Sequence, residues 1–334
     1  MFLAISASTN GTKVKAKIII KIIVMLLIFL FYHSFSLIET EKILFYNGIS
    51  AKRERIYTKQ EAFIMIIDFH THIFPDKVAE KAVPKLASVI NHTPSMNGTA
   101  AGLLDSMEKS GVDVSVILPV VTNPRQTDSI IRFASEINET YAENASYRLI
   151  SFAGLHPVCD NYKDILKLIK REGFQGIKLH PNYQGVYFDD IRYMRIIYTA
   201  SELGLSVLTH AGDDPYTPDE AFCSPDMILH VLEDTAPPRL ILAHMGSNGN
   251  YQEAEEKLCG KNVYFDTSYS IMHMEEEQFT RMIHLHGADK VLFGTDAPWT
   301  YQKDCVEKLK SLTGLSEKEK QQILWENAAY LLGI

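Results

Sequence analysis

Residues 66–72 read Ile-Ile-Asp-Phe-His-Thr-His, a short apolar run that turns polar at its end. Such a run favours a buried β-strand, because it is rich in branched and aromatic residues. Side chains alternate along a strand, so His70 and His72, at its end, point to the same side. Met65 stands directly before the run, and a compact domain would begin here.

The same kind of run recurs along the rest of the chain, each time followed by a segment with helical spacing. The eight runs start about 32 residues apart on average, which suits strands that alternate with helices in a parallel sheet. The predicted strands are Ile64–Phe69, Val114–Pro119, Leu149–Leu155, Gly176–Leu179, Ser206–Thr209, Leu240–Ala243, Val263–Phe265 and Lys290–Phe293.

Apolar residues between the runs follow the spacing of a helix with one buried face. Ile130, Ala134, Ile137 and Tyr141 form one such stripe. Eight strand–helix units in about 270 residues match the usual size of a (β/α)8 TIM barrel, an α/β fold. A doubly wound open sheet is the alternative, but no G-x-G-x-x-G or phosphate-binding loop follows any predicted strand.

The composition is that of a folded globular protein: 334 residues, 46% hydrophobic, 22% charged, with a net charge of −8. It excludes a disordered chain, a disulfide-stapled miniprotein and a strongly basic nucleic-acid binder. The four cysteines form no C-x-x-C pair and fit free thiols; they are Cys159, Cys223, Cys259 and Cys305.

Charge divides the chain into an extension, residues 1–64, and a domain, residues 65–334. The extension holds nine Lys/Arg and four Asp/Glu, a balance of +5, whereas the domain holds 24 and 37, a balance of −13. Four lysines precede an apolar run over residues 22–32, which resembles a secretory signal and is short for a membrane anchor. Alternatively, translation starts at Met65 and the extension is not part of the working protein.

The expected cellular location of the protein depends on whether residues 1–64 belong to it. A start at Met65 predicts a cytoplasmic protein, whereas a functional extension predicts export or membrane anchoring. Membrane contact is expected only if residues 18–37 are a real anchor. Association into a homo-oligomer is compatible with the fold, but the sequence does not decide it.

Polar residues gather at the ends of the predicted strands. In a barrel the carboxyl ends of the strands meet at one mouth, where catalytic groups cluster. Three imidazoles and one carboxylate there suit Zn²⁺ or a similar divalent ion, which activates water at neutral pH. The predicted metal ligands are His70, His72, His210 and Asp296, with His244 beside them. Alone, His210 would fit a hydrogen-bonded core histidine, Asp296 a turn or helix cap and His244 a strand cap. Their coincidence with His70 and His72 at strand ends favours a metal site.

Other residues are weaker candidates. Lys178 and His180 end the fourth run on one side of the strand, as an ion pair, a substrate contact or a satisfied polar residue. His156 ends the third run and is a possible substrate contact, and Trp299 is a possible apolar wall near Asp296. His273, His284 and His286 fall in a predicted helix and are expected at the surface.

From Met65 to Ile334 the sequence resembles the amidohydrolase superfamily, in the branch that includes aminocarboxymuconate-semialdehyde decarboxylase. The matching text is Ile67-Asp68-Phe69-His70-Thr71-His72, Gly176-Ile177-Lys178-Leu179-His180-Pro181, Leu208-Thr209-His210-Ala211-Gly212, Ala243-His244-Met245-Gly246, Phe293-Gly294-Thr295-Asp296 and the tail 325–333. The ordered set is specific for the superfamily and says little about the substrate.

The resemblance implies a metal held by the four predicted ligands. It implies that Asp296 also serves as a base and that His244 stabilises charge on a polarised carbonyl oxygen. Some amidohydrolases carry a carboxylated lysine that bridges two metals, and Lys178 occupies that place. One metal, and two metals with carboxylated Lys178, therefore both remain open.

Three functions follow from these expectations. The first is a metal-dependent hydrolase that attacks a C–N or C–O carbonyl bond of a small molecule: an amide, cyclic amide, ester or lactone. The second is a metal-dependent, non-oxidative decarboxylase of a small aromatic or unsaturated acid. It calls for a cation to hold a second carboxylate, and the candidates are Lys178, Arg192 and Arg195, although neither arginine lies clearly at a strand end. The third is a non-catalytic metal-binding barrel, which Asp296 and His244 argue against.

Overall fold

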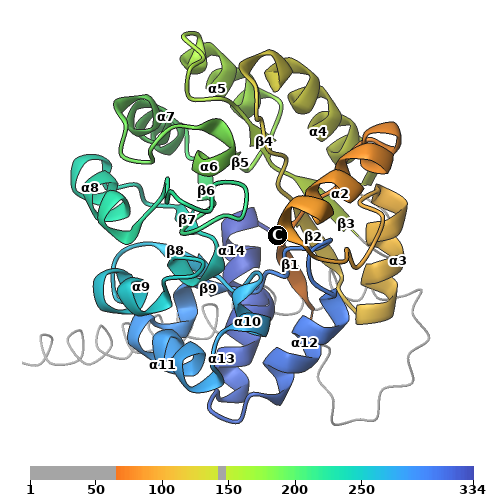
Figure 1. The fold of residues 1–334 in the computed structure, drawn as a ribbon, viewed down its shortest axis with the longest axis vertical. Helices are drawn as coiled ribbons and strands as arrows, with labels where there is room; N and C mark the ends of the chain where they lie inside the picture. The colour runs from red at the N-terminus through yellow and green to blue at the C-terminus, as the bar shows by residue number, and fades with distance from the viewer. Residues whose placement is uncertain (1–64, 142–147) are drawn as a thin grey trace, which may run out of the picture. The chain divides into compact units, whose positions relative to one another are not determined.

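The computed structural model describes residues 65–141 and 148–334. The predicted extension, with its expected signal, anchor or alternative start, lies outside the described residues. In the described part strands and helices alternate, and the helices surround the strands (Figure 1).

The strands are β1 (Ile67–Thr71), β2 (Val114–Ile117), β3 (Arg148–Ser151), β4 (Ala153–Gly154), β5 (Gly176–Leu179), β6 (Ser206–Thr209), β7 (Leu240–Leu242), β8 (Tyr264–Asp266) and β9 (Val291–Leu292). The longer helices are α2 (Asp76–Ile90), α3 (Ala100–Ser110), α4 (Thr127–Tyr141), α5 (Tyr162–Arg171), α7 (Ile191–Glu202), α8 (Pro225–Thr235), α9 (Tyr251–Leu258), α11 (Glu276–His286) and α12 (Gln302–Ser311). The shorter ones are α6 (Pro181–Gln184), α10 (Ser270–His273), α13 (Glu317–Gln321), α14 (Asn327–Leu332), η1 (Pro124–Gln126), η2 (His244–Gly246), η3 (Ala288–Lys290) and η4 (Gln322–Glu326).

All strand pairs of the described chain are parallel, in the orders β1-β2-β3 and β4-β5-β6-β7-β8-β9. Only Phe152 separates β3 from β4, and its N–H donates to the Ile117 carbonyl at 2.9 Å. At the other edge, the Phe69 N–H donates to the Phe293 carbonyl at 2.7 Å. These hydrogen bonds join the last strand to the first, so the fold is α/β with parallel strands and is consistent with a (β/α)8 barrel.

The predicted strands correspond closely to the observed ones. β5 and β6 have the predicted bounds, and the predicted third run is divided into β3 and β4. Every residue of β1, β2, β5 and β6 is buried, as expected where helices cover one face and the barrel interior the other. Inside, Phe69 packs edge-to-face on Phe152, with ring centroids 5.7 Å apart.

Helix α4 has the predicted buried stripe, except that Ile131 replaces Ile130 as its first buried isoleucine. Ala134 and Ile137 are buried, and Ile131 is more deeply buried than the predicted Ile130. Neighbouring positions on a helix are about 100° apart, so both isoleucines border the same stripe. Helix α3 ends at Gly111, whose φ of 76° is the left-handed conformation that glycine adopts without strain.

No helix in the residue ranges 65–141 and 148–334 combines the length and apolar character needed to cross a lipid bilayer. The predicted anchor over residues 18–37 falls outside these ranges.

Candidate active site

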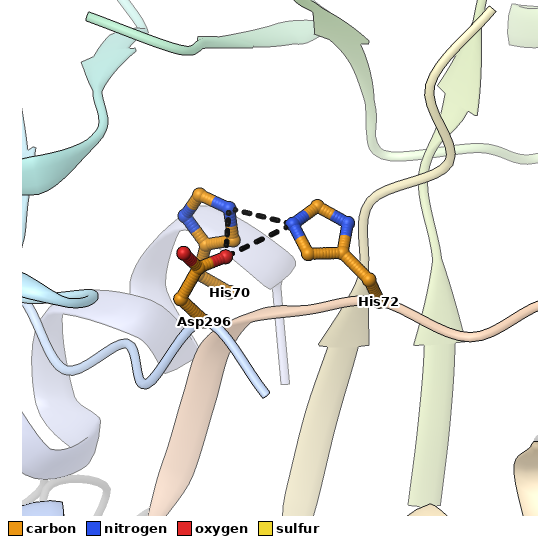
Figure 2. Close-up of side chains that lie close together, drawn as sticks. All are labelled: His70, His72 and Asp296. Atoms are coloured by element: carbon orange, nitrogen blue, oxygen red, sulfur yellow. Dashed lines mark hydrogen bonds and ion pairs between the residues drawn. The ribbon is translucent and has the colours of Figure 1, made fainter. Parts of the chain in front are cut away.

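Two histidines from β1 and the aspartate after β9 bring three ligand atoms together (Figure 2). Nε2 of His70 lies 3.1 Å from Nε2 of His72, and Oδ1 of Asp296 lies 3.5 Å and 3.1 Å from these two atoms. The second carboxylate oxygen of Asp296 points away from His72 in Figure 2. His70 is buried and His72 is partly exposed, so solvent reaches the trio on the side of His72.

The outer nitrogens of the two rings determine where their protons sit. Nδ1 of His70 lies 2.8 Å from a carboxylate oxygen of Asp266, and Nδ1 of His72 lies 2.9 Å from the Leu118 carbonyl. Both partners only accept hydrogen bonds, so each Nδ1 donates and each neutral ring has a lone pair on Nε2.

Two lone pairs and one carboxylate oxygen of Asp296 therefore face one another, and nothing within that trio supplies a proton. Such a set is unfavourable alone and is satisfied by a divalent cation. Histidines whose second nitrogen donates to a carboxylate or carbonyl are typical of metal ligands. The donor set fits a metal ion.

Both carboxylates of this region are held ionised. Burial alone would raise the pKa of Asp266, but the adjacent His70 and His244 and the hydroxyl of Ser268 outweigh it, so its pKa lies well below the usual range. For Asp296, burial would again raise the pKa, but the contact with His72 and the nearby His70 and His244 outweigh it and hold its pKa well below the usual range.

The turns after β7 and β9 hold two of the site residues in unusual backbone conformations. His244 has φ of 58° and Asp296 has φ of 69°, values uncommon for residues other than glycine. The His244 N–H donates to Asp266 Oδ1 at 3.0 Å, and the Asp296 N–H donates to the His70 carbonyl at 2.8 Å. Strained conformations fixed in this way are concentrated at functional sites.

His244 and His210 lie beside the trio. The His244 ring centroid is 5.3 Å from that of His70 and 4.8 Å from that of His210. Nδ1 of His244 donates to the Ser268 carbonyl at 3.0 Å. Nδ1 of His210 lies 3.1 Å from Nε2 of His244, and Nε2 of His210 lies 3.2 Å from the Asp213 carbonyl. The structure thus places His244 next to His70. His210 lies on the other side of His244, where its ligand atoms group with those of His180 and Asp214.

Lys178, from β5, is fully buried, and its Nζ lies 3.4 Å from Nε2 of His70. Burial lowers the pKa of its amine to about 8, against the opposing effect of Asp266, Asp296 and Asp214. A cation is thereby placed at the edge of the trio.

The remaining predicted residues lie differently. His156 accepts a hydrogen bond from the Val158 N–H at 3.4 Å, and its pKa is lowered by burial and by Arg192. Trp299 is half-buried, and its N–H donates to the Asp296 carbonyl at 2.8 Å, which closes the turn that carries this ligand. In the described structure, neither side chain joins the grouped metal-ligand atoms.

Asp266, Ser268 and Asp214 were not singled out from the sequence. Asp266 ends β8 directly after the buried run Val263–Phe265, the same position that drew attention to the other strand ends. The expectation that functional residues lie at strand ends would therefore also have identified Asp266. Asp214 lies in the segment between β6 and α8 and does not directly follow a strand, so the pattern gave no signal for it.

A family model described as Amidohydrolase matches residues 67–334. The chain belongs to the amidohydrolase family. It is an enzyme of that superfamily, and the expected resemblance is confirmed. No curated protein sequence matches it.

Solved structures share the fold of this amidohydrolase. A 5-carboxyvanillate decarboxylase from Sphingomonas paucimobilis superposes with a TM-score of 0.62 at 15% identity, over 81% of this chain and 100% of that one. A dihydroxybenzoic acid decarboxylase from Polaromonas sp. JS666, with manganese and 2-nitroresorcinol bound, gives 0.60 at 17% identity, over 81% and 97%. A 5-carboxyvanillate decarboxylase from Novosphingobium aromaticivorans, with manganese and 4-hydroxy-3-methoxy-5-nitrobenzoic acid, gives 0.61 at 17%, over 84% and 99%.

These comparisons correct the leading functional expectation. The sequence favoured a hydrolase of carbonyl C–N or C–O bonds, and that prediction is wrong, because the similar structures are decarboxylases of aromatic acids. The strand-end ligands gave no basis for the choice, since both reactions use the same ligand set. Zinc is likewise not confirmed, since the metal named in the similar structures is manganese.

Proposed function

We propose that this amidohydrolase is a metal-dependent, non-oxidative decarboxylase of a small aromatic acid. The observation that carries the proposal is the trio of His70, His72 and Asp296 with the buried ammonium of Lys178 at its edge. The trio suits a divalent metal, and the ammonium suits the carboxylate of the substrate. The similar decarboxylases support the same chemistry on the same fold.

We assign His70, His72 and Asp296 as ligands of one divalent ion, and manganese is the first choice from the similar structures. His210 remains the prediction for a fourth ligand, because it ends β6 beside His244, which in turn lies beside His70. When bound, the ion polarises the oxygen atoms of the substrate and neutralises their charge. A second metal with carboxylated Lys178 stays an alternative that metal analysis would distinguish.

The reaction exchanges a carboxylate for a proton on one ring carbon. Ionised Asp296 takes a proton from the hydroxyl group of a phenolic acid and holds it on Oδ2, because Oδ1 is the oxygen that contacts His70 and His72. It then passes the proton to the ring carbon that bears the carboxylate. The carbon–carbon bond breaks, its electron pair returns to the ring, and CO₂ leaves; the phenolate regains a proton from water.

Two features of the chain support this sequence of steps. Lys178 Nζ orients the departing carboxylate, and burial excludes the water that would compete for this cation. His244, with Nδ1 fixed by the Ser268 carbonyl, lies beside His70 and positions the substrate oxygen atoms.

We also infer that residues 65–334 form one (β/α)8 domain and that residues 1–64 are a separate extension. A small-molecule substrate would bind at the carboxyl ends of the strands, beside the trio.

The test is product analysis with manganese-loaded protein. Hydroxybenzoates, benzoates, lactones and amides are incubated with the wild type and with Asp296→Asn, and CO₂ and ring products are measured. We expect CO₂ and the corresponding phenol from at least one hydroxybenzoate with the wild type only. Hydrolysis of lactones or amides without CO₂ release from any acid would reject the proposal.

A further inference from the structure

Asp68, two residues before His70 on β1, carries a buried carboxylate that has no step in the proposed reaction. It is not one of the residues whose ligand atoms group together in the described chain. Burial of a carboxyl group is costly unless its oxygens accept hydrogen bonds. The groups that donate to Asp68 therefore indicate which part of the structure this carboxylate holds.

Four donor groups converge on the Asp68 carboxylate. Oδ1 accepts from the His70 N–H at 3.2 Å and from the Thr295 N–H at 3.0 Å. Oδ2 accepts from the Thr295 hydroxyl at 2.5 Å and from Nε2 of Gln302 at 2.7 Å. Thr295 directly precedes Asp296, so one side chain is bonded to the backbone at His70 and beside Asp296, two of the proposed metal ligands.

The backbone beside β1 departs from a regular parallel ladder at this point. The Phe69 N–H donates to the Phe293 carbonyl at 2.7 Å. Three residues later on β1, the His72 N–H donates at 2.7 Å to the carbonyl of Ala297, which lies four residues beyond Phe293. One extra residue on the second chain is the pattern of a β-bulge, which redirects a side chain and interrupts the ladder.

Asp296 lies in this bulge and has φ of 69°, a conformation that persists only when the surrounding structure holds it. Besides its own hydrogen bond to β1, it is held from both sides. On the C-terminal side, the Ala297 carbonyl accepts from the His72 N–H. On the N-terminal side, Thr295 is tied to Asp68 by both its N–H and its hydroxyl. The Asp68 carboxylate is therefore the side-chain anchor of the turn that carries Asp296.

Gln302 extends the same network to the neighbouring elements. It begins α12 and is almost fully buried. Its Nε2, which donates to Asp68, also lies 3.2 Å from the hydroxyl oxygen of Ser115 on β2. The carboxylate thus joins β1 to the turn after β9 and, through Gln302, to α12 and β2.

We propose that Asp68 is a positioning residue, which holds the Asp296 carboxylate in place against His70 and His72. Its effect on metal binding does not depend on which reaction the enzyme catalyses. Its effect on turnover rests on the proposed function, in which Asp296 also moves the proton. A displaced Asp296 would slow that transfer even when the metal is bound, because proton transfer requires close contact.

The test compares Asp68→Asn with Asp113→Asn. Asparagine keeps the size of the side chain but presents an N–H donor to a network of donors. Asp113 is the matched control, because it is also a buried aspartate that accepts a backbone N–H, from Ile66 at 2.9 Å. That contact lies at the opposite end of β1 from the histidines. A milder variant, Thr295→Val, removes one donor to Asp68 and keeps the shape of the side chain.

Manganese affinity of each variant is measured by calorimetry, and stability by thermal unfolding of the metal-free protein. We expect both aspartate variants to unfold at lower temperature than the wild type. Only Asp68→Asn should also bind manganese about 10- to 100-fold more weakly, the usual effect of losing a partner behind the ligands. Thr295→Val should weaken manganese binding in the same direction and by less.

Wild-type manganese affinity in folded Asp68→Asn, or equal losses of affinity in the two aspartate variants, would overturn the proposal. If Asp68→Asn does not fold, unchanged affinity in Thr295→Val would overturn it. At saturating manganese, kcat of Asp68→Asn should stay reduced while KM changes little. Recovery of the wild-type kcat would overturn the part of the proposal that concerns turnover.

The two proposals fail separately. If Asp68→Asn loses manganese affinity but the wild type releases CO₂ from no acid, the positioning role stands and the decarboxylase does not. If the wild type releases CO₂ and the folded variants bind manganese as tightly as it does, the decarboxylase stands and the positioning role does not.

Discussion

Asp266 accepts a hydrogen bond from Nδ1 of His70 at 2.8 Å, and neither residue is exposed. This contact fixes the proton of His70 on Nδ1 and turns the Nε2 lone pair toward His72 and Asp296. The geometry of the metal site therefore depends on a carboxylate that does not itself join the trio.

Replacement of Asp266 by Asn should weaken metal binding about 10- to 100-fold, the usual effect of losing such an outer partner. The asparagine keeps the size of the side chain but no longer requires His70 to donate. The measurement is manganese affinity, with thermal unfolding to show that the variant is folded. The control is Asp304→Asn, at an exposed position of α12, and this variant should bind metal normally. Unchanged affinity in folded Asp266→Asn would show that the contact does not orient the ligand.

Lys178→Met should leave metal binding intact and lower kcat/KM by about 10- to 100-fold, because methionine preserves length but not charge. The loss should appear with carboxylate substrates and should be absent in the binding of a phenol that lacks the carboxylate. Lys303→Met, an exposed lysine on α12, is the matched control. Full activity of Lys178→Met would mean that another group holds the carboxylate.

Gly294 leaves no room for a methyl group behind the metal site. A Cβ there would lie 2.9 Å from Cβ of His70 and 3.3 Å from Cβ of Ser268. Gly294→Ala should therefore lower both the free energy of unfolding and metal affinity. Gly314→Ala is the comparison, since its Cβ would meet Thr280 at 2.7 Å, away from the trio. It should cost stability without affecting the metal, and equal metal loss in both variants would contradict the account.

The free energy of unfolding should decrease as the pH is lowered, partly because of His286. Its ring stacks on Phe265 at 3.9 Å, and burial lowers its pKa from 6.5 to about 4. Between pH 6.5 and pH 4 the His286 side chain is protonated in the unfolded chain but not in the folded chain. The stability that the neutral, buried ring contributes is therefore complete above pH 6.5 and is lost as the pH falls toward 4. The stability advantage of wild type over His286→Gln should shrink by about 3 kcal/mol over that window.

Urea unfolding of metal-free protein at several pH values measures this difference. The other buried histidines titrate in both proteins and cancel in the comparison. An advantage that stays constant from pH 7 to pH 4 would contradict the assignment.

The order of strands and the trio were accessible from the sequence because both depend on local pattern. The buried runs at β5 and β6 are continuous and bounded, so their limits are unambiguous. The spacing of His70 and His72 on one strand places both rings on one side without knowledge of the rest of the fold.

Other features depend on contacts between distant segments. The grouping of His210 with His180 and Asp214 follows from the segment after β6 folding back, which no strand rule describes. His286 was expected at the surface from its helix, yet it is buried against Phe265 of β8, because only the packed structure shows which helix face is covered. The choice of reaction also lay beyond the ligands, since specificity depends on the loops around them.

The most direct test of the central claim is the rate of CO₂ release as a function of bound manganese. Metal-free protein is titrated with manganese in the presence of the carboxyl-labelled hydroxybenzoate that binds most tightly, and labelled CO₂ and bound metal are measured together. The account predicts no release without metal and a rate that rises in proportion to occupancy up to one ion per chain. Release that is independent of metal, or none from fully loaded protein with any hydroxybenzoate, would contradict it.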